Sequence, residues 1–206
     1  MKNPVIAVDL DDVLASSAQG FVDYSNKRWG TRLTVEDYTE HWHEMWSTDH
    51  AETVRRARDV YSSGTIGEFI HFDEALPVLK ELSKRYDLVI TTSRNRVALE
   101  ETEGWIKKHF EDIFSDVHFA GIWDDWARKQ RTLEQAAKLT KAELLKGIGA
   151  TYLIDDHPKH WFGAAKVGVK CLLYGDYSWN RNLKLPDGVT RVKDWDAILM
   201  YFDEQA

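Results

Sequence analysis

The sequence has a single cysteine, no long apolar run and no excess of basic residues. Cys171 lies in an apolar stretch, so the chain forms no internal disulfide and suits a reducing compartment. We find no signal peptide, no lipidation motif and no stretch able to cross a bilayer, so we expect a cytoplasmic protein without a membrane partner. A net charge of −7 argues against polymeric nucleic acid as a partner, because that ligand needs a broad basic face. A small phosphorylated ligand remains compatible with this charge.

The composition and the pattern of apolar runs indicate one globular core with an insertion. The 206 residues are 43% hydrophobic, which is enough for a substantial core. From residue 73 onward, short apolar runs alternate with amphipathic stretches, a pattern typical of an α/β fold with a parallel sheet. Residues 15–72 contain helical stretches and no good strand candidate. We therefore expect a doubly wound parallel core from residues 1–14 and 73–206, with a small helical cap from residues 15–72.

The first apolar run carries the clearest chemical signal. Residues 5–8 suit a strand buried on both faces, and Asp9, Asp11 and Asp12 follow at its carboxyl end. Ligands of open α/β sheets bind at that end of the strands. Asp9 and Asp11 are two residues apart, so in extended backbone they point the same way, and a hard divalent cation such as Mg²⁺ would relieve their repulsion. An ordinary turn after a strand is the alternative interpretation.

Two further predicted strands also end in polar groups. The strand over residues 88–92 ends at Thr92 and Ser93, where a hydroxyl and free backbone N–H groups could cradle a phosphate. A simple helix N-cap is the alternative there. The strand over residues 151–154 leads into Asp155 and Asp156. Because parallel strands end at one edge of a sheet, we expect these groups to lie close to Asp9.

Lys141 is the candidate cation for this edge. Residues 140–143, Thr-Lys-Ala-Glu, have the form of a capping box, which predicts that Lys141 lies in the first turn of a helix. A cation there opposes the helix dipole, which hints at another task for this side chain. Lys138 and Lys146 compete for the same role.

Taken in chain order, these groups resemble the four motifs of the haloacid dehalogenase (HAD) superfamily of aspartate-nucleophile phosphatases. The matching residues are Asp9 with Asp11, then Thr92, then Lys141, then Asp155 with Asp156. More narrowly, residues 153–158 and 177–180 are similar to the 5′-nucleotidase branch that includes the deoxyribonucleotidases. Asp12 is a departure, because many phosphatases of this branch have glycine at that position.

This resemblance implies a five-stranded Rossmann-like core with strand order 3-2-1-4-5 and a site between strands 1 and 4. Asp9 would be the nucleophile that forms an aspartyl-phosphate. Asp11 would protonate the leaving alcohol and then activate water. The implied fold and roles together describe a phosphoric monoester hydrolase.

The resemblance also implies the ligand sets. Asp9, the backbone carbonyl of Asp11, and Asp155 would hold Mg²⁺, with Asp156 supporting the metal or binding it through water. Thr92, Ser93 and Lys141 would bind the oxygens of the transferring phosphoryl group.

A nucleoside 5′-monophosphate, such as a deoxyribonucleotide, is the expected substrate because the cap is rich in aromatic residues. Trp42 and Trp46 are the leading candidates to stack a base, with Phe21 and Trp29 as further aromatics that core packing explains equally well. Other phosphate monoesters, including sugar phosphates, are alternatives.

Three other classes stay open from the sequence. A dehalogenase would not need the full carboxylate set, and a phospho-accepting receiver would not have an acid pair after the threonine and lysine. A catalytically idle binding domain would have no reason to keep the whole set. Magnesium-dependent turnover separates these classes from a phosphatase. The sequence carries no signal for an oligomeric state.

Overall fold

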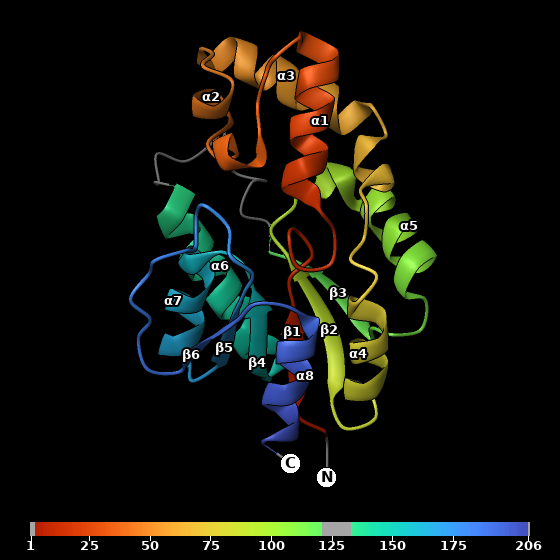
Figure 1. Cartoon of the computed structure of the whole chain (residues 1–206), viewed down its shortest axis with the longest axis vertical. Helices are drawn as coiled ribbons and strands as arrows, with labels where there is room; N and C mark the ends of the chain where they lie inside the picture. Colours follow the sequence, from red (N-terminus) through yellow and green to blue (C-terminus); the bar gives the residue numbers. More distant parts are fainter. Residues whose placement is uncertain (1–2, 121–132, 206) are drawn as a thin grey trace.

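The chain folds into a six-stranded parallel sheet with helices on both faces (Figure 1). The computed structural model describes residues 3–120 and 133–205. The strands are β1 (Val5–Val8), β2 (Asp87–Thr92), β3 (Asp116–Phe119), β4 (Ala150–Asp155), β5 (Lys170–Tyr174) and β6 (Val189–Val192). Their order across the sheet is β3-β2-β1-β4-β5-β6, and each neighbouring pair is parallel.

This arrangement confirms the expected α/β core and its 3-2-1-4-5 order, and β6 adds a strand at one edge. The apolar pattern predicts only five strands, because β6 has four residues and two of them, Thr190 and Arg191, are polar. Val189 and Val192 are buried, and the strand pairs with β5 from Cys171 to Tyr174.

Alternate side chains of each strand pack on opposite faces of the sheet. Ile6 and Val8 of β1 lie in the apolar cluster that includes α4 (Ala75–Leu82), α5 (Leu99–Phe110) and α8 (Trp195–Asp203). Val5 and Ala7 lie in the cluster that includes α6 (Leu133–Ile148) and α7 (Pro158–Lys166). The strand is thus buried on both sides, which explains why it reads as a continuous apolar run.

The helical cap follows β1 and lies beyond the carboxyl ends of the strands (Figure 1). Its elements are α1 (Ser17–Trp29), the short 3-10 helix η1 (Val35–Asp37), α2 (Trp42–Met45), α3 (His50–Ser62) and the 3-10 helix η2 (Thr65–Glu68). Gly30 caps the end of α1, and its φ of 66° allows its N–H to donate back to the Asn26 carbonyl. Thr34 and Asp37 form a capping box at the start of η1. The helix is short because the chain is already extended at Tyr38, whose ring stacks on Phe21.

Two linkers that pair with each other join the cap to the core. The Ser16 N–H donates to the Ile70 carbonyl at 2.8 Å, and the Phe72 N–H donates to the Leu14 carbonyl at 2.9 Å. Ala15 and His71 form an antiparallel bridge between them. The exact domain limits, after residues 14 and 72, stay predictions. Among the helices of residues 3–120 and 133–205, none has the length and apolar character needed to span a bilayer.

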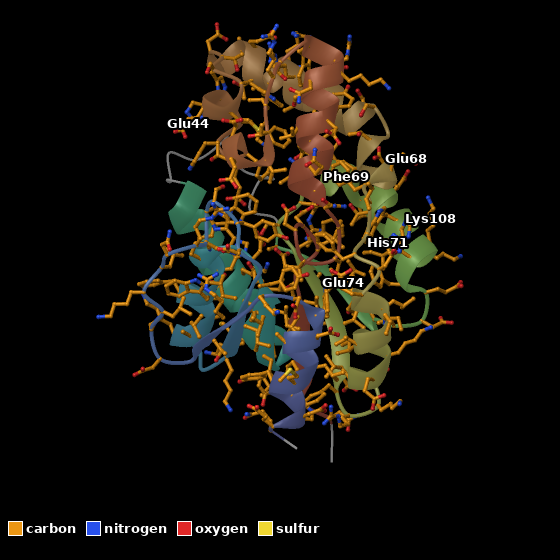
Figure 2. All side chains as sticks on the ribbon, viewed as in Figure 1. Glu44, Glu68, Phe69, His71, Glu74 and Lys108 are labelled. Atoms are coloured by element: carbon orange, nitrogen blue, oxygen red, sulfur yellow. The ribbon has the colours of Figure 1, made fainter. Side chains whose placement is uncertain are left out.

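Phe69, at the return from cap to core, sets a tight packing constraint on α1 (Figure 2). Its ring contacts Phe21 at 5.0 Å between centroids, and its carbonyl accepts a hydrogen bond from the Trp105 indole. A Cβ atom added at Gly20 would lie 2.3 Å from the Phe69 ring. Gly20 therefore allows the close approach of α1 to this ring.

We expect Gly20→Ala to lower the free energy of unfolding by about 1–3 kcal/mol, because the added methyl group overpacks this contact. Gly104→Ala is the matched control, since Gly104 is exposed within α5 and has open space around it. That change should raise the free energy of unfolding by up to about 1 kcal/mol, the usual helix-propensity gain. Chemical denaturation followed by circular dichroism measures both. A Gly20→Ala protein as stable as the wild type would contradict the packing described.

Candidate active site

The backbone of β1 and β4 aims two carboxylates at the same face of the sheet. Val8 pairs with Ile154, and the Asp9 N–H continues the ladder to the Ile154 carbonyl at 2.8 Å. Val8 and Ile154 both pack in the cluster with α4 and α8. By strand alternation, the next residue on each chain, Asp9 or Asp155, faces α6 and α7.

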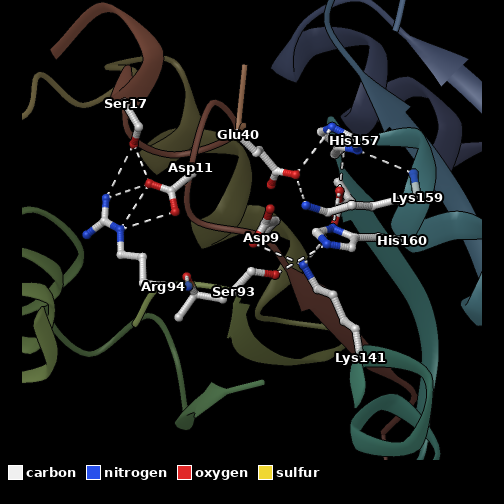
Figure 3. Close-up of polar contacts among 12 residues, drawn as sticks. Asp9, Asp11, Ser17, Glu40, Ser93, Arg94, Lys141, His157, Lys159 and His160 are labelled. Carbon is white, nitrogen blue, oxygen red and sulfur yellow. Dashed lines mark hydrogen bonds and ion pairs between the residues drawn. The ribbon is translucent and has the colours of Figure 1, made fainter. Parts of the chain in front are cut away.

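Lys141 from α6 and His160 from α7 meet these two carboxylates (Figure 3). The Lys141 ammonium donates to Asp155 Oδ2 at 2.6 Å and lies 3.1 Å from Asp9 Oδ1. His160 Nδ1 lies 2.8 Å from Asp155 Oδ2 and 3.3 Å from Lys141 Nζ. On the other side of the ring, His160 Nε2 lies 3.3 Å from Ser93 Oγ. Asp9, Asp155, Lys141 and His160 form one buried, polar cluster beneath the cap, and Ser93 contacts it through His160.

Lys141 lies midway along α6 rather than in the first turn of a helix, so that part of the prediction is wrong. The helix begins at Leu133, before the Thr-x-x-Glu pattern at residues 140–143. The Lys141 side chain is fully buried, which is rare for lysine unless it has charged partners. The structure places the Lys141 ammonium between two carboxylates, and its task beyond solvation stays a prediction.

Burial and repulsion set the protonation of the cluster. Burial raises the pKa of Asp9 to about 7, with Lys141 opposing the shift and Asp155 and Asp11 adding to it. Burial would also raise the pKa of Asp155, but His160 and Lys141 outweigh it and hold that pKa well below its usual range. Burial lowers the pKa of His160 to about 3, so its imidazole is neutral near pH 7. Lys141 is thus the cation that faces Asp9 and Asp155.

The chemistry of the cluster fits a hard divalent cation. Asp9, Asp155 and His160 each offer a ligand atom within 4.8 Å of the others. Within the described part of the chain, the buried Asp9 Oδ1 has no hydrogen-bond partner of good geometry. Carboxylate oxygens are the ligands that Mg²⁺ prefers, and an additional positive charge would lower the raised pKa of Asp9. His160 is committed to Asp155 and Ser93, so the oxygens are the better ligands.

Asp11, the predicted acid–base residue, is held apart from this cluster (Figure 3). Its Oδ1 accepts hydrogen bonds from Ser17 Oγ at 2.5 Å and from Arg94 Nη2 at 2.8 Å. The Arg94 Nε lies 3.0 Å from the same oxygen, and the Arg94 side chain is 5% exposed. Arg94 also donates to Thr102 of α5 at 3.2 Å. A buried guanidinium therefore ties Asp11 to the junction of core and cap.

Asp12 shows what replaces the glycine expected at its position. Its φ is +55°, in the left-handed region where glycine is easiest and aspartate is tolerated. Its carboxylate accepts hydrogen bonds from the Ala18 N–H at 3.0 and 3.2 Å, in the first turn of α1. Burial holds its pKa well above the usual range, with the Ala18 hydrogen bond opposing the shift. Asp12 thus keeps the turn and anchors the cap helix.

Asp156 is held by the loop after β5. Its Oδ2 accepts a hydrogen bond from the Trp179 indole at 2.6 Å, and its carbonyl accepts one from Asn180 Nδ2 at 2.9 Å. Burial and the neighbouring aspartates raise its pKa well above the usual range. Trp179 stacks on Tyr177 at 4.6 Å and meets the cap residue Tyr38 edge-on at 5.6 Å. Asp156 thus lies next to the cluster, and Trp179 and Asn180 of the loop after β5 hold it in place.

Thr92 and Ser93 lie at the end of β2, as predicted, and both are buried. Thr92 Oγ1 accepts a hydrogen bond from the Arg94 N–H at 3.1 Å, which shapes the turn. Ser93 is the one whose hydroxyl contacts the cluster, through His160. The N-cap interpretation holds for neither residue, since Asn95 caps the short helix η3 (Arg96–Ala98) that follows.

A cavity of about 460 Å³ lies between the cap and this edge of the sheet. The core contributes Asp11, Ser93 and Arg94 to its wall. The cap contributes four aromatic side chains, Phe21, Tyr38, Trp42 and Tyr61. Trp46 does not line this cavity. It is buried in the cap against Trp29 and Trp42, with its indole donating to Ser25, so its placement gives no support to a stacking role.

Sequence reasoning missed four residues of the site. His160 and Arg94 contact the predicted carboxylates, and Glu40 of the cap pairs with Lys159 of α7. Arg94 follows the predicted Thr92-Ser93 turn directly, which was a usable signal. His160 also lies close in sequence, five residues after the predicted Asp155. Glu40 and Lys159 depend on a contact between distant segments, because they are 119 positions apart.

Solved structures of other proteins have the same fold. The chain is similar to a haloacid dehalogenase-like family hydrolase from Streptococcus pneumoniae, at 19% identity and a TM-score of 0.69, over 97% of this chain and 98% of that one. It is similar to Protein Tyrosine Kinase A from Mycobacterium tuberculosis, at 17% identity and a TM-score of 0.71, over 97% and 98%. It is also similar to the HAD hydrolase YfnB from Bacillus subtilis bound to magnesium, at 12% identity and a TM-score of 0.63, over 98% and 100%. The fold is therefore that of the HAD superfamily.

A family model then places the chain more narrowly. It matches residues 3–121, and the chain belongs to that family, described as 5′ nucleotidase, deoxy (Pyrimidine), cytosolic type C protein. No curated protein matches the chain significantly. The resemblance to the HAD superfamily and its nucleotidase branch is confirmed. The matched residues include Asp9, Asp11 and Thr92, whereas Lys141 and Asp155 lie beyond them.

The raised pKa of Asp9 predicts a pH dependence of stability in the metal-free protein. The folded state binds the Asp9 proton with a pKa of about 7, against an ordinary value of 3.8. This proton therefore stabilises the folded state at acidic pH, and the contribution is lost as the pH rises toward 7. In urea denaturation with a chelator present, the stability of the wild type relative to Asp9→Asn should fall between about pH 4 and pH 7. A relative stability that is constant or rises over that range would contradict the buried state of Asp9.

Proposed function

We propose that the protein is a Mg²⁺-dependent phosphomonoester hydrolase that works through an aspartyl-phosphate on Asp9. The observation that carries this proposal is the buried Asp9 carboxylate, 3.1 Å from the Lys141 ammonium and beside Asp155 at the strand ends. A carboxylate that attacks a phosphate dianion meets repulsion, and fixed positive charge at that point offsets it. Membership of the nucleotidase family supports the same reaction.

In the first step, an Asp9 oxygen forms a bond to phosphorus while the bond from phosphorus to the ester oxygen breaks. Asp11 gives its proton to the departing alkoxide, so the alcohol leaves neutral. In the second step, Asp11 takes a proton from water as the water oxygen attacks phosphorus, which releases inorganic phosphate and restores Asp9. Lys141 and the Ser93 hydroxyl stabilise the phosphoryl oxygens in both steps.

Asp9 and Asp155, with the Asp11 backbone carbonyl and Asp156 in support, would hold the metal. Bound there, Mg²⁺ would neutralise charge on the phosphoryl group and keep Asp9 ionised. Asp11 reaches the leaving group only when its carboxylate separates from Arg94 and Ser17, which hold it in this structure. Because Ser17 begins α1, we propose that movement of the cap, residues 15–72, accompanies that release.

We propose a nucleoside 5′-monophosphate, such as a deoxyribonucleotide, as the substrate. The cavity has the volume of a small-molecule site, and its cap wall is aromatic while its core wall is polar. Trp42 is half-buried, lines the cavity and is the candidate for stacking a base. Phe21 and Tyr38 belong to the same wall, and Phe21 packs against both Trp42 and Tyr38. The phosphate end would then point toward Ser93 and the Asp9 cluster.

Phosphate release from a panel of monoesters, including nucleoside monophosphates and sugar phosphates, tests the reaction and the substrate. We expect turnover with Mg²⁺ and none with a chelator. Asp9→Asn should abolish it, and Lys141→Met should lower kcat by about 100-fold or more, because it removes the fixed charge at the phosphoryl group. Asp196→Asn, an exposed carboxylate on α8, is the matched control and should leave activity unchanged.

Circular dichroism shows that each variant is folded. A folded wild type with Mg²⁺ that releases no phosphate from any ester, or an Asp9→Asn protein that keeps full turnover, would overturn the proposed reaction. Turnover of sugar phosphates in preference to nucleotides would agree with the proposed reaction but overturn the proposal of a nucleotide substrate.

A further inference from the structure

One acidic side chain of the cap, Glu40, pairs with basic residues that adjoin the Asp9 cluster. Glu40 lies between η1 and α2, and its Oε2 forms an ion pair with the Lys159 ammonium and lies 3.7 Å from His157 Nε2 (Figure 3). The Lys159 side chain is 7% exposed. A second ion pair between this cap segment and the core, Glu36 with Arg181, is exposed on both sides. In the Glu40 pair, by contrast, the Lys159 ammonium is largely removed from water, while the Glu40 side chain is 26% exposed.

Lys159 lies where an anion is favoured. It is in the first turn of α7, where the helix dipole attracts negative charge, so a lysine there increases an existing preference. Its own N–H is already used, because it donates to His157 Nδ1 at 3.3 Å. His160 of the same turn contacts Asp155 and Lys141. Lys159 and His160 are thus two side chains of one turn, the first facing the cap and the second facing the Asp9 cluster.

Glu40 is also a wall residue of the cavity, together with Asp11 and Ser93. Asp9 is not part of that wall and is only 4% exposed. In Figure 3, Glu40 and Lys159 meet on the cap side of the cluster formed by Asp9, Lys141 and His160. A nucleophile that attacks phosphorus has to be reached by the phosphoryl group, so a group on the cap side has to move first.

We propose that the Glu40 carboxylate occupies the place of the substrate's phosphoryl group on Lys159, and that Lys159 becomes a second phosphoryl-binding cation when Glu40 is displaced. The inference rests on the proposed function, because it assigns a role within the same site. Glu40 and phosphate compete for one cation, so the cap stays closed over Asp9 until an anion takes the place of the carboxylate.

Binding of inorganic phosphate to the full chain, measured by titration calorimetry with Mg²⁺ present, tests this competition. Glu40→Gln keeps the size of the side chain and removes its charge, and it should tighten phosphate binding by about three- to tenfold. Lys159→Met should weaken it by about tenfold, whereas Lys159→Arg, which keeps the charge, should retain most of the affinity.

Glu36→Gln is the matched control, because it breaks an ion pair between the same cap segment and the core but lies outside the cavity wall. It should leave phosphate affinity within about twofold of the wild type. An equal gain in Glu36→Gln would mean that loosening the cap explains the effect, and would overturn the proposal. No gain in Glu40→Gln, or no phosphate binding in any of the proteins, would overturn it as well.

The phosphate-release panel keeps this result separate from the proposed function. Turnover by the wild type with no gain in Glu40→Gln would reject the competition and leave the hydrolase intact. A gain in Glu40→Gln in a protein that hydrolyses no ester would reject the hydrolase and support an anion site governed by Glu40.

Discussion

The burial of several carboxylates around one lysine at the edge of the sheet is the constraint on which the rest of the structure depends. Asp155 accepts a hydrogen bond from Lys141, Asp12 accepts one from an N–H in the first turn of α1, and Asp156 accepts one from the Trp179 indole. Asp9 lies beside the Lys141 charge, and within the described residues its Oδ1 has no hydrogen-bond partner of good geometry. A buried group with a strongly raised pKa beside a fixed cation is typical of a reactive site, and Asp9 is that group here.

The same residues that form the site also attach the cap. Asp12 caps α1, Asp11 binds the Ser17 hydroxyl at the start of α1, and Trp179 contacts both Asp156 and the cap residue Tyr38. Any movement of α1 relative to the sheet therefore changes hydrogen bonds of the carboxylates. The position of the cap and the geometry of the carboxylates are therefore coupled. A ligand that binds one arrangement of the carboxylates better also shifts the position of the cap.

Much of the fold and part of the site followed from periodicity. Buried strands read as apolar runs, and the end of each run marks the sheet edge, which is why the sequence places Asp9, Thr92 and Asp155 at that edge. Two errors have local causes: the four-residue pattern around Lys141 occurs inside a longer helix, and two of the four residues of β6 are polar. Contacts such as the Glu40 pair depend on tertiary structure, which no local pattern encodes.

Trapping of the phosphoryl group tests the central claim, that Asp9 is a nucleophile, most directly. The wild type would be mixed with a nucleoside 5′-monophosphate and Mg²⁺, quenched in acid within the first turnover, reduced with borohydride and mapped by peptide mass spectrometry. Reduction of an acyl phosphate converts aspartate to homoserine, and the account predicts this change at Asp9. Phosphate release with no trapped residue, or with the change at Asp11 or Asp155, would contradict it.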